Sequence, residues 1–192
     1  MDLYIIRHGQ SESNVAKTYC GLSQVNLTEK GRSDAANAGR ILKGIEFEKV
    51  YASDLIRAIQ TCEIALNGAE FEIDTLLREI DVGILGGLTL AQAEDKYGDK
   101  VRTARRQRDY SGFGGESTED QQSRIAKFMR KIEQGGFTGN VAVFCHEGTV
   151  RCMLDYILSM RFGTPRAVVD NGSVSIFDWD GERWRLKKWN IT

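Results

Sequence analysis

Two apolar runs of the sequence end in a histidine. His8 follows residues 3–6 with Arg7 between them, and His146 follows residues 141–145 directly. A neutral imidazole can act as a nucleophile, and a guanidinium binds anionic oxygens through several N–H groups at once. Taken alone, Arg7-His8-Gly9 is equally consistent with two interpretations. The pair could bind an anion, or it could be a surface cation beside a hydrogen-bonded histidine at a strand end. The positions of further polar residues bear on that choice.

A second arginine is expected close to the first. Residues 50–52 are a short β-prone run, Ser53 and Asp54 offer N-cap oxygens, and apolar side chains then recur at helical spacing over residues 55–66. Arg57 falls in the first turn of this predicted helix. Because helical side chains lean toward the N-terminus of their helix, its guanidinium is expected at the end of the preceding strand.

The elements that must position these side chains follow an α/β pattern. β-prone runs alternate with helical patterns, two of them starting at the N-cap candidates Thr28 and Ser117, which is typical of a mostly parallel sheet with helices on both faces. Asp180-Gly181 lies between two β-prone runs and predicts a hairpin, so we expect an antiparallel C-terminal edge. We therefore predict a single-domain three-layer sandwich. Ligands of such sheets bind beyond the carboxyl ends of the strands, where the histidines and arginines are expected to meet.

Glu79 and Asp81 are the carboxylates that could donate a proton at this rim. Both lie between the third predicted strand, residues 71–74, and a glycine-rich turn. Glu79 also has a purely structural interpretation, as a loop-capping carboxylate paired with Arg78. Asp81 is the weaker candidate for the donor.

Residues 88–113 carry many charges of both signs in a weakly helical pattern. The basic ones are Lys96, Lys100, Arg102, Arg105, Arg106 and Arg108. Such a mixture is usually a solvated face. Its place in the chain also fits a cap over a ligand pocket, so we expect a cap-like insertion around 84–115 and a preference for substrates with a second anionic group.

Length and composition favour one cytoplasmic domain that binds a small molecule. The chain has 192 residues, 41% hydrophobic and 28% charged, which is typical of a globular domain spanning 1–192. No apolar run approaches the ~20 residues of a membrane-spanning helix, and the N-terminus shows no signal-peptide pattern. With 26 basic and 27 acidic residues, the chain is nearly neutral, which disfavours nucleic acid and membranes as partners. The sequence leaves a homodimer open.

The sequence indicates no metal site. The chain has four cysteines and two histidines. The cysteines show no CxxC spacing, and no cysteine and histidine are spaced along the sequence as metal ligands usually are. The cysteines are therefore expected to be reduced thiols in a reducing compartment.

The motifs around these residues resemble the histidine phosphatase superfamily, also called the phosphoglycerate mutase-like family. The matching segments follow the order of that family and span nearly the whole chain: RHGQSESN at 7–14, LTEKG at 27–31, SDLIRAIQT at 53–61, LREIDVG at 77–83, GGES at 114–117 and CHEGTVR at 145–151. Together they are highly specific, whereas RHG alone is not.

The resemblance implies a phosphomonoesterase that acts on small phosphorylated metabolites without a metal or other cofactor. His8 would be the nucleophile that becomes phosphohistidine, and Glu79 would protonate the leaving oxygen and then activate water. The phosphoryl group would be held by Arg7, Asn14, Arg57 and His146. A phosphoglycerate mutase and a non-catalytic phosphate-binding module are the alternatives. Mutases of the family usually carry longer insertions, so the short chain favours the phosphatase.

Two positions depart from the pattern of the family. Residues 85–87 are Leu-Gly-Gly where Trp-Glu-Gly is common, and Glu147 stands where glycine is common. The second change adds a carboxylate beside the expected pocket. That carboxylate could stabilise the helix that follows it or weaken phosphate binding by repulsion.

Overall fold

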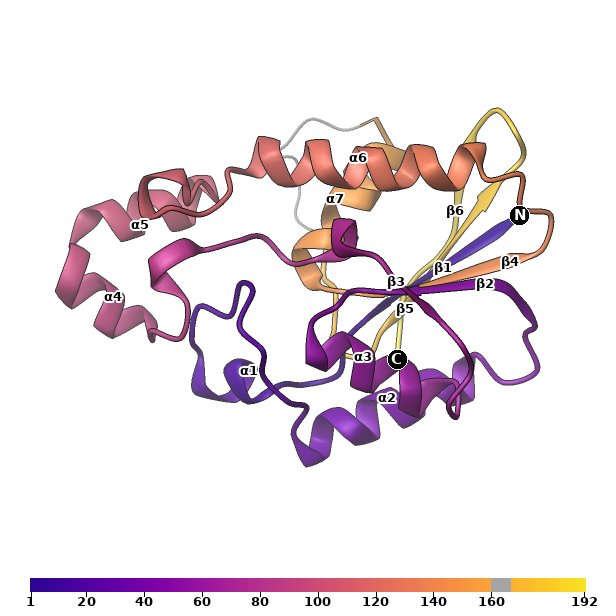
Figure 1. Cartoon of the computed structure of the whole chain (residues 1–192), viewed down its shortest axis with the longest axis horizontal. Helices are drawn as coiled ribbons and strands as arrows, with labels where there is room; N and C mark the ends of the chain where they lie inside the picture. Colours follow the sequence, from indigo (N-terminus) through magenta and orange to yellow (C-terminus); the bar gives the residue numbers. More distant parts are fainter. Residues whose placement is uncertain (160–166) are drawn as a thin grey trace.

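Six strands form one mixed sheet in the centre of the molecule (Figure 1). The computed structural model describes residues 1–159 and 167–192. In chain order the strands are β1 (Asp2–Arg7), β2 (Phe47–Ala52), β3 (Glu72–Ile73), β4 (Asn140–Cys145), β5 (Val174–Trp179) and β6 (Trp184–Ile191). Across the sheet their order is β3-β2-β4-β1-β5-β6. β1 to β4 run parallel and β5 pairs antiparallel with β1 and β6, which confirms the predicted mostly parallel sheet with an antiparallel C-terminal edge.

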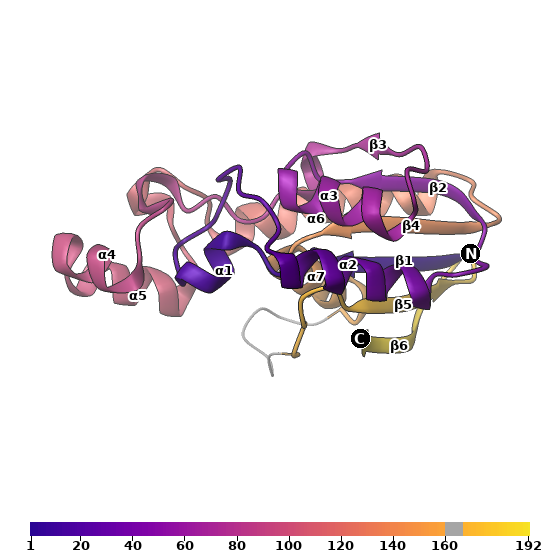
Figure 2. The same ribbon diagram turned by 90° about the horizontal axis from the view of Figure 1, so that it is seen from below.

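Helices cover both faces of this sheet, with α2 and α3 on one face and α6 and α7 on the other (Figure 2). The α-helices are α1 (Glu12–Ala16), α2 (Glu29–Ile41), α3 (Ile56–Ala65), α4 (Leu90–Tyr97), α5 (Asp99–Gln107), α6 (Thr118–Gln134) and α7 (Glu147–Ile157). The 3₁₀ turns are η1 (Thr75–Leu77), η2 (Gly83–Leu85) and η3 (Ser111–Phe113). The expected three-layer sandwich is therefore confirmed. No helix in the described part of the chain is long and apolar enough to span a membrane.

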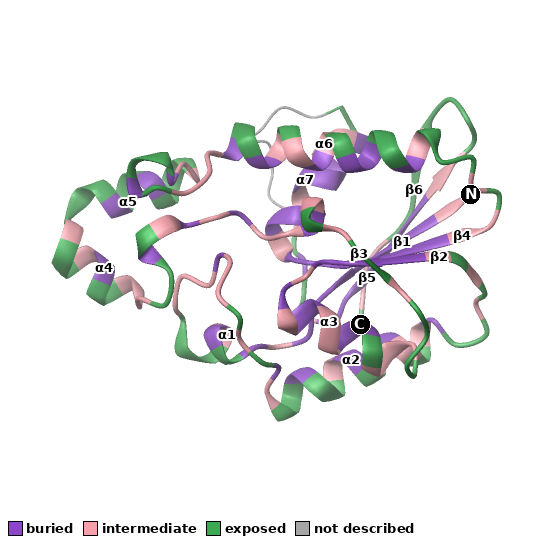
Figure 3. Ribbon diagram, in the orientation of Figure 1, coloured by how far each residue is buried: buried purple, intermediate pink, exposed green. Residues whose placement is uncertain are grey.

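β1 is buried on both faces, which explains its unbroken apolar run. Leu3 and Ile5 pack with the apolar cluster beneath α6 and α7, whereas Tyr4 and Ile6 pack with the cluster beneath α2 and α3. Figure 3 shows the central strands as the most deeply buried part of the molecule. A strand with apolar partners on both faces needs no polar alternation, and the polar residues of β1 are its two end residues, Asp2 and Arg7.

The strand register brings the two histidines to the same level of the sheet. Arg7 of β1 pairs with Cys145 of β4, and His8 and His146 are the residues that follow them. The end of β2 pairs with β4 on its other side. The turns after β1, β2 and β4 therefore meet at one rim.

The start of α3 differs from the prediction. Thr28 and Ser117 cap α2 and α6 as predicted, each accepting a hydrogen bond from a backbone N–H of its helix. The residue at the N-cap of α3 is Leu55, without a side-chain cap, so the predicted cap by Ser53 and Asp54 is wrong. Ser53 Oγ accepts from Leu55 N over 3.4 Å, but its shorter contact is with the ring of His146 at 2.9 Å, and Asp54 pairs with Arg78.

The part of the chain that holds α4 and α5 extends from one end of the molecule, at the left of Figure 1, and the segment between β3 and α6 leads to it. This segment encloses an apolar cluster of its own, made of Ile80, Val82, Leu85, Ala93, Val101, Ala104, Tyr110 and Phe113. The outer faces of α4 and α5 are largely exposed (Figure 3). The weakly helical pattern of residues 88–113 thus corresponds to two short helices, each packed on one face and solvated on the other.

Candidate active site

His8 lies at the end of β1 and is only 5% exposed. Its Nδ1 is 2.7 Å from the carbonyl oxygen of Gly9, which can only accept, so we assign the ring proton to Nδ1. Nε2 then carries a free lone pair, to which Arg57 Nε donates over 3.3 Å. Burial and the charges of Arg57 and Arg7 hold the pKa of His8 well below its ordinary value. The ring is therefore neutral at neutral pH, with a nucleophilic Nε2.

The turn after β1 passes very close to α2. A Cβ on Gly9 would lie 2.1 Å from the carbonyl oxygen of Gly31, and a Cβ on Gly31 would lie 1.9 Å from that of Gln10. Gly9 N also donates to Thr61 Oγ1 of α3 over 3.1 Å. The close backbone approach therefore requires both glycines, and it fixes the carbonyl group that orients His8.

His146 lies at the end of β4, fully buried, with its ring centroid 5.2 Å from that of His8. The Ser53 hydroxyl is 2.9 Å from Nε2. Burial, followed by the charge of Arg57, lowers the pKa of His146 well below its ordinary value. Nδ1 is buried and has no hydrogen-bond partner within residues 1–159 and 167–192. Such an orphan ring nitrogen is rare, and an anionic oxygen bound here would pair with it.

Arg57 is a fixed cation in the first turn of α3, as the helical pattern predicted. Its side chain is 1% exposed. Nη1 donates to the carbonyl oxygen of Ser23 and Nη2 to that of Gly21, both over 2.9 Å, while Nε faces His8. Burial lowers the pKa of Arg57, but a guanidinium stays protonated. The carbonyl contacts therefore hold a positive charge beside the Nε2 lone pair.

Arg7 approaches from the end of β1 and is 9% exposed. Its Nη1 donates to the carbonyl oxygen of Val169, and its Nη2 lies 3.1 Å from Glu147 Oε2. Arg7 Nε is buried without a partner in the described part of the chain. One edge of this guanidinium is thus held by the protein, while a further N–H remains for a ligand.

Glu79 is held by three donors. Oε1 accepts from Ile80 N over 2.8 Å and from Gln121 Nε2 over 3.1 Å, and Oε2 accepts from Gly148 N over 3.0 Å. Burial raises the pKa of Glu79, but the charge of Arg108 and the backbone N–H groups outweigh burial and leave the pKa below its ordinary value. The carboxyl is therefore ionised at neutral pH.

Arg78 does not pair with Glu79, contrary to the structural interpretation of that carboxylate. Its guanidinium forms a fork with both oxygens of Asp54, with the shortest contact at 2.5 Å. Asp81, the weaker candidate, accepts from Gly83 N over 2.8 Å. Glu79 is thus the carboxylate that contacts the start of α7, next to His146.

Gly148 allows this contact. A Cβ at this position would lie 2.2 Å from Glu79 Oε1 and 2.6 Å from Arg108 Nη2. The contact therefore requires a glycine at position 148. Position 147, where the family commonly has glycine, carries a glutamate in this chain.

The segment that carries Glu79 has little regular structure and depends on Arg124 of α6. Arg124 donates to the carbonyl oxygens of Leu76, Arg78 and Glu79 over 2.7, 2.9 and 3.3 Å. It also pairs with Glu116 at 2.8 Å. Sequence reasoning missed this role because Arg124 occupies an ordinary polar position of an amphipathic helix.

Asn14 is connected to His8 through one intermediate residue, Asn171. Asn14 Oδ1 accepts from Ser11 N over 2.9 Å and so caps α1. Asn171 donates to the same oxygen over 3.3 Å and to the carbonyl oxygen of His8 over 3.1 Å. Asn171 was also missed, since it follows no motif. The structure therefore brings His8 into contact with Arg57 and His146, and connects Asn14 to His8 through Asn171.

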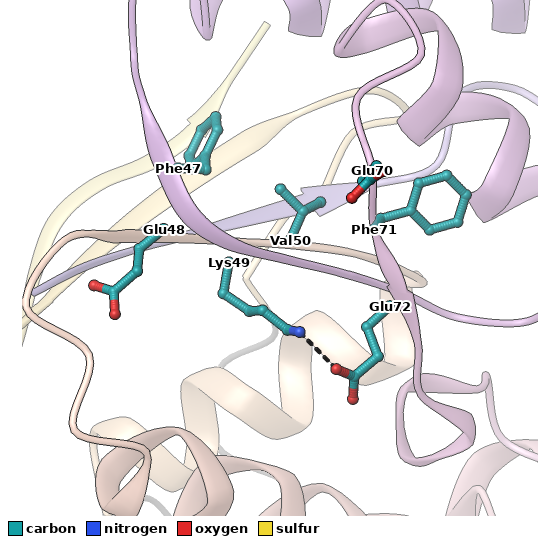
Figure 4. Close-up of a pocket in the computed structure, with 7 residues that line it drawn as sticks. All are labelled: Phe47, Glu48, Lys49, Val50, Glu70, Phe71 and Glu72. Carbon is teal, nitrogen blue, oxygen red and sulfur yellow. Dashed lines mark ion pairs between the residues drawn. The ribbon is translucent and has the colours of Figure 1, made fainter.

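Four other pockets in the described part of the chain have linings without a histidine. A pocket of about 440 Å³ along β2 and β3 is lined by Phe47, Glu48, Lys49, Val50, Glu70, Phe71 and Glu72 (Figure 4). Its Lys49 is paired with Glu72 at 2.6 Å. Within residues 1–159 and 167–192, no three His, Cys, Asp or Glu side chains gather in a way that could hold a metal ion.

The chain is also similar in sequence to known proteins. Residues 3–192 match the model of the histidine phosphatase superfamily (branch 1). A 2,3-bisphosphoglycerate-dependent phosphoglycerate mutase of Azorhizobium caulinodans is 36% identical over 79% of this chain and 79% of its own length. A broad-specificity phosphatase of Saccharomyces cerevisiae is 31% identical over 92% of this chain and 79% of its own length.

Solved structures share the fold over the whole chain. A mycobacterial glucosyl-3-phosphoglycerate phosphatase is 27% identical, with a TM-score of 0.85 over 100% of this chain and 99% of its own. The alpha-ribazole phosphatase of Shigella flexneri is 22% identical and shares the fold, with a TM-score of 0.90 over 100% and 96% of the two chains. Because the family match extends over nearly every residue, this protein is an enzyme of branch 1 of the histidine phosphatase superfamily.

Proposed function

We propose that this protein is a metal-independent phosphomonoesterase that hydrolyses small phosphorylated metabolites through a phosphohistidine on His8. The observation that carries the proposal is the neutral ring of His8, whose Nε2 lone pair faces the guanidinium of Arg57. A nucleophile must be unprotonated to attack phosphorus, and a cation beside it attracts the anionic group that contains the phosphorus.

In the first step, His8 Nε2 attacks the phosphorus atom opposite the leaving oxygen. The N–P bond forms as the P–O bond breaks, and the electron pair of the broken bond stays on the leaving oxygen. Glu79 is ionised in the free enzyme at neutral pH and must first take up a proton; it then gives this proton to the leaving oxygen, so that an alcohol departs. The enzyme is left with phosphohistidine on His8 and a carboxylate on Glu79.

In the second step, water replaces the alcohol. The Glu79 carboxylate takes a proton from water while the water oxygen attacks phosphorus, and the N–P bond breaks as the new P–O bond forms. Inorganic phosphate leaves, His8 Nε2 regains its lone pair, and Glu79 is protonated again. Two easier displacements thus replace one difficult displacement.

Arg7, Arg57 and His146 hold the phosphoryl oxygens in both steps. At an effective dielectric near 20, a cation within ~4 Å of a unit negative charge contributes about 4 kcal/mol before desolvation costs. Because the two guanidinium groups and the neutral ring of His146 are already fixed by the protein, they need no reorganisation as charge shifts between oxygens. The orphan Nδ1 of His146 and Nε of Arg7 supply further contacts for the oxygens.

A pocket of about 410 Å³ is our candidate for the second anion site that we expected from the basic segment. Its lining is Lys17, Thr18, Tyr19, Leu90 and Arg105. Tyr19 is two residues from Gly21, whose carbonyl oxygen holds Arg57, so the pocket is close in sequence to a residue that contacts the phosphoryl site. The remainder of a substrate would extend from His8 toward Lys17 and Arg105.

Arg105→Ala is expected to raise KM roughly tenfold for phosphate esters that carry a second carboxylate or phosphate, the effect of losing a charged contact of about 1.5 kcal/mol. KM for p-nitrophenyl phosphate should not change. Steady-state assays on both substrates test this. Arg102→Ala is the matched control, because Arg102 pairs with Glu94 and Asp99 on the surface. Equal effects of the two variants would remove the role of Arg105.

The proposed function predicts that phosphate release greatly exceeds isomerisation of phosphoglycerate. The protein, treated with EDTA, should release phosphate from a panel of phosphorylated metabolites, and vanadate should inhibit the release. Magnesium should not be needed, since side chains supply the positive charge. A requirement for restored metal would contradict the proposal, as would a protein that releases phosphate from no ester.

Phosphoglycerate mutase activity is the second candidate, favoured by the similarity to the mutase of Azorhizobium caulinodans. Both activities use the same phosphohistidine, but a mutase must retain a bisphosphorylated intermediate and reorient it. Efficient interconversion of the two phosphoglycerates, with little phosphate released, would establish the mutase instead.

A further inference from the structure

Glu147 places a carboxylate on a guanidinium of the phosphoryl site. Its Oε2 lies 3.1 Å from Arg7 Nη2, and its Oε1 lies 2.6 Å from Arg151 Nη2. The Arg7 side chain is 10% exposed and that of Glu147 is 36% exposed. One carboxylate thus bridges two guanidinium groups at the start of α7, next to His146.

We propose that Glu147 is an internal counter-anion that weakens phosphate binding and so commits the enzyme to hydrolysis rather than phosphoryl retention. Arg7 gives one N–H to Val169 and another to Glu147, so a phosphoryl group must share the guanidinium with a carboxylate. This inference rests on the proposed function, because it assigns Arg7 to the phosphoryl group.

The size of the effect follows from charge repulsion. Two anions that share one guanidinium lie within about 8 Å of each other, and at an effective dielectric near 20 their repulsion is sufficient for at least a tenfold change in affinity. The repulsion acts on the phosphate product and on any bisphosphorylated ligand. A hydrolase gains from rapid product release, whereas a mutase would lose its intermediate.

Stabilisation of α7 is the competing role. A carboxylate in the first turn interacts favourably with the helix dipole whether or not it contacts a ligand. Glu29 provides a matched control, because it is the first residue of α2, as Glu147 is of α7, and is exposed. Removing the charge of either glutamate removes the same dipole interaction, but only Glu147 contacts Arg7.

The test compares Glu147→Gln, Glu147→Gly and Glu29→Gln with the wild-type protein. Glutamine keeps a hydrogen-bond acceptor for Arg7 and removes the charge, whereas glycine removes the side chain. Calorimetry should measure the binding of orthovanadate and of inorganic phosphate, and melting temperatures should be recorded for each variant. Both Glu147 variants are expected to bind the two anions about tenfold more tightly, a change of ~1.4 kcal/mol. Glu29→Gln should bind them as the wild type does.

Two results with the variants would each overturn the inference. Unchanged anion binding with lowered melting temperatures in all variants would assign Glu147 to the helix alone. Weaker binding in Glu147→Gln would mean that the carboxylate positions Arg7 for phosphate. Anion binding is measured without turnover. A wild-type protein that binds vanadate but hydrolyses no ester would therefore contradict the proposed function and leave the effect of Glu147 on anion binding testable. A wild-type protein that binds neither anion refutes both.

Discussion

Substitution of His8 by alanine is expected to abolish phosphate release, with a loss in kcat on the order of 10⁶-fold, the scale of removing a catalytic nucleophile. The neutral ring with Nε2 directed at Arg57 is the group that forms the covalent bond in the proposed mechanism. Brief exposure of the wild-type protein to a radiolabelled phosphate ester should label His8. The label should be stable in base and lost in acid, as expected of phosphohistidine.

The second histidine supplies the control for this experiment. His146 is also buried and neutral, but its Nε2 contacts Ser53, and it is proposed to hold the phosphoryl oxygens rather than to attack. His146→Ala should therefore label more slowly and still on His8. A label on His146, or a folded His8→Ala protein that keeps its turnover, would overturn the assignment of the nucleophile.

Glu79→Gln is expected to lower kcat/KM for alkyl phosphates by about 10²–10⁴-fold, the usual contribution of a general acid. An alkoxide is a poor leaving group and needs the proton of Glu79. Nitrophenolate leaves without one, so kcat/KM for p-nitrophenyl phosphate should fall far less. Glutamine keeps the size of the side chain and one of its two accepting oxygens, so the variant loses the charge and part of the three-donor contact.

Rapid mixing separates the two steps of this variant. Because Glu79 also activates water, Glu79→Gln should release one equivalent of nitrophenolate quickly and then turn over slowly while phosphohistidine accumulates. Asp81→Asn is the control, since Asp81 accepts from Gly83 N, and it should show neither effect. Equal losses on alkyl and aryl esters, without a burst, would contradict the role of Glu79.

The pH dependence of the wild-type protein follows from the same two groups. The pKa of Glu79 is below its ordinary value, so its protonated fraction in the free enzyme rises as pH falls. The pKa of His8 is also lowered, so the nucleophile stays neutral into acid. After correction for substrate ionisation, kcat/KM for an alkyl phosphate should therefore increase toward acid pH, and Glu79→Gln should lose that increase.

Local patterns were sufficient to predict most of the fold. The apolar run of β1, the N-cap at Thr28 and the hairpin at Asp180-Gly181 depend on neighbours in the sequence, and the structure confirms the elements that they predicted. The N-cap of α3 was wrong because Ser53 had a partner far along the chain, the ring of His146. A capping pattern cannot reveal a competing long-range contact.

In the candidate site, too, local patterns predicted the positions of residues but not their long-range contacts. Strand ends predicted that His8, Arg57 and His146 would meet, and they are in contact, while their chemical roles stay predictions. The contacts of Arg124 and Asn171 could not be predicted, because each side chain bonds to backbone carbonyl groups of distant segments. Their residue types carry no sign of those partners.

The sheet order also determines when the site can assemble. β1 pairs with β4 and β5, both of which lie beyond residue 139. A growing chain therefore carries an unpaired strand with four consecutive apolar residues, 3–6, until β4 and β5 have been synthesised. Such long-range pairing slows folding and leaves an edge open to aggregation. The segment that ends in His8 is made before β4 and β5 and is placed in the sheet only after them, so the active site forms late in the synthesis of this domain.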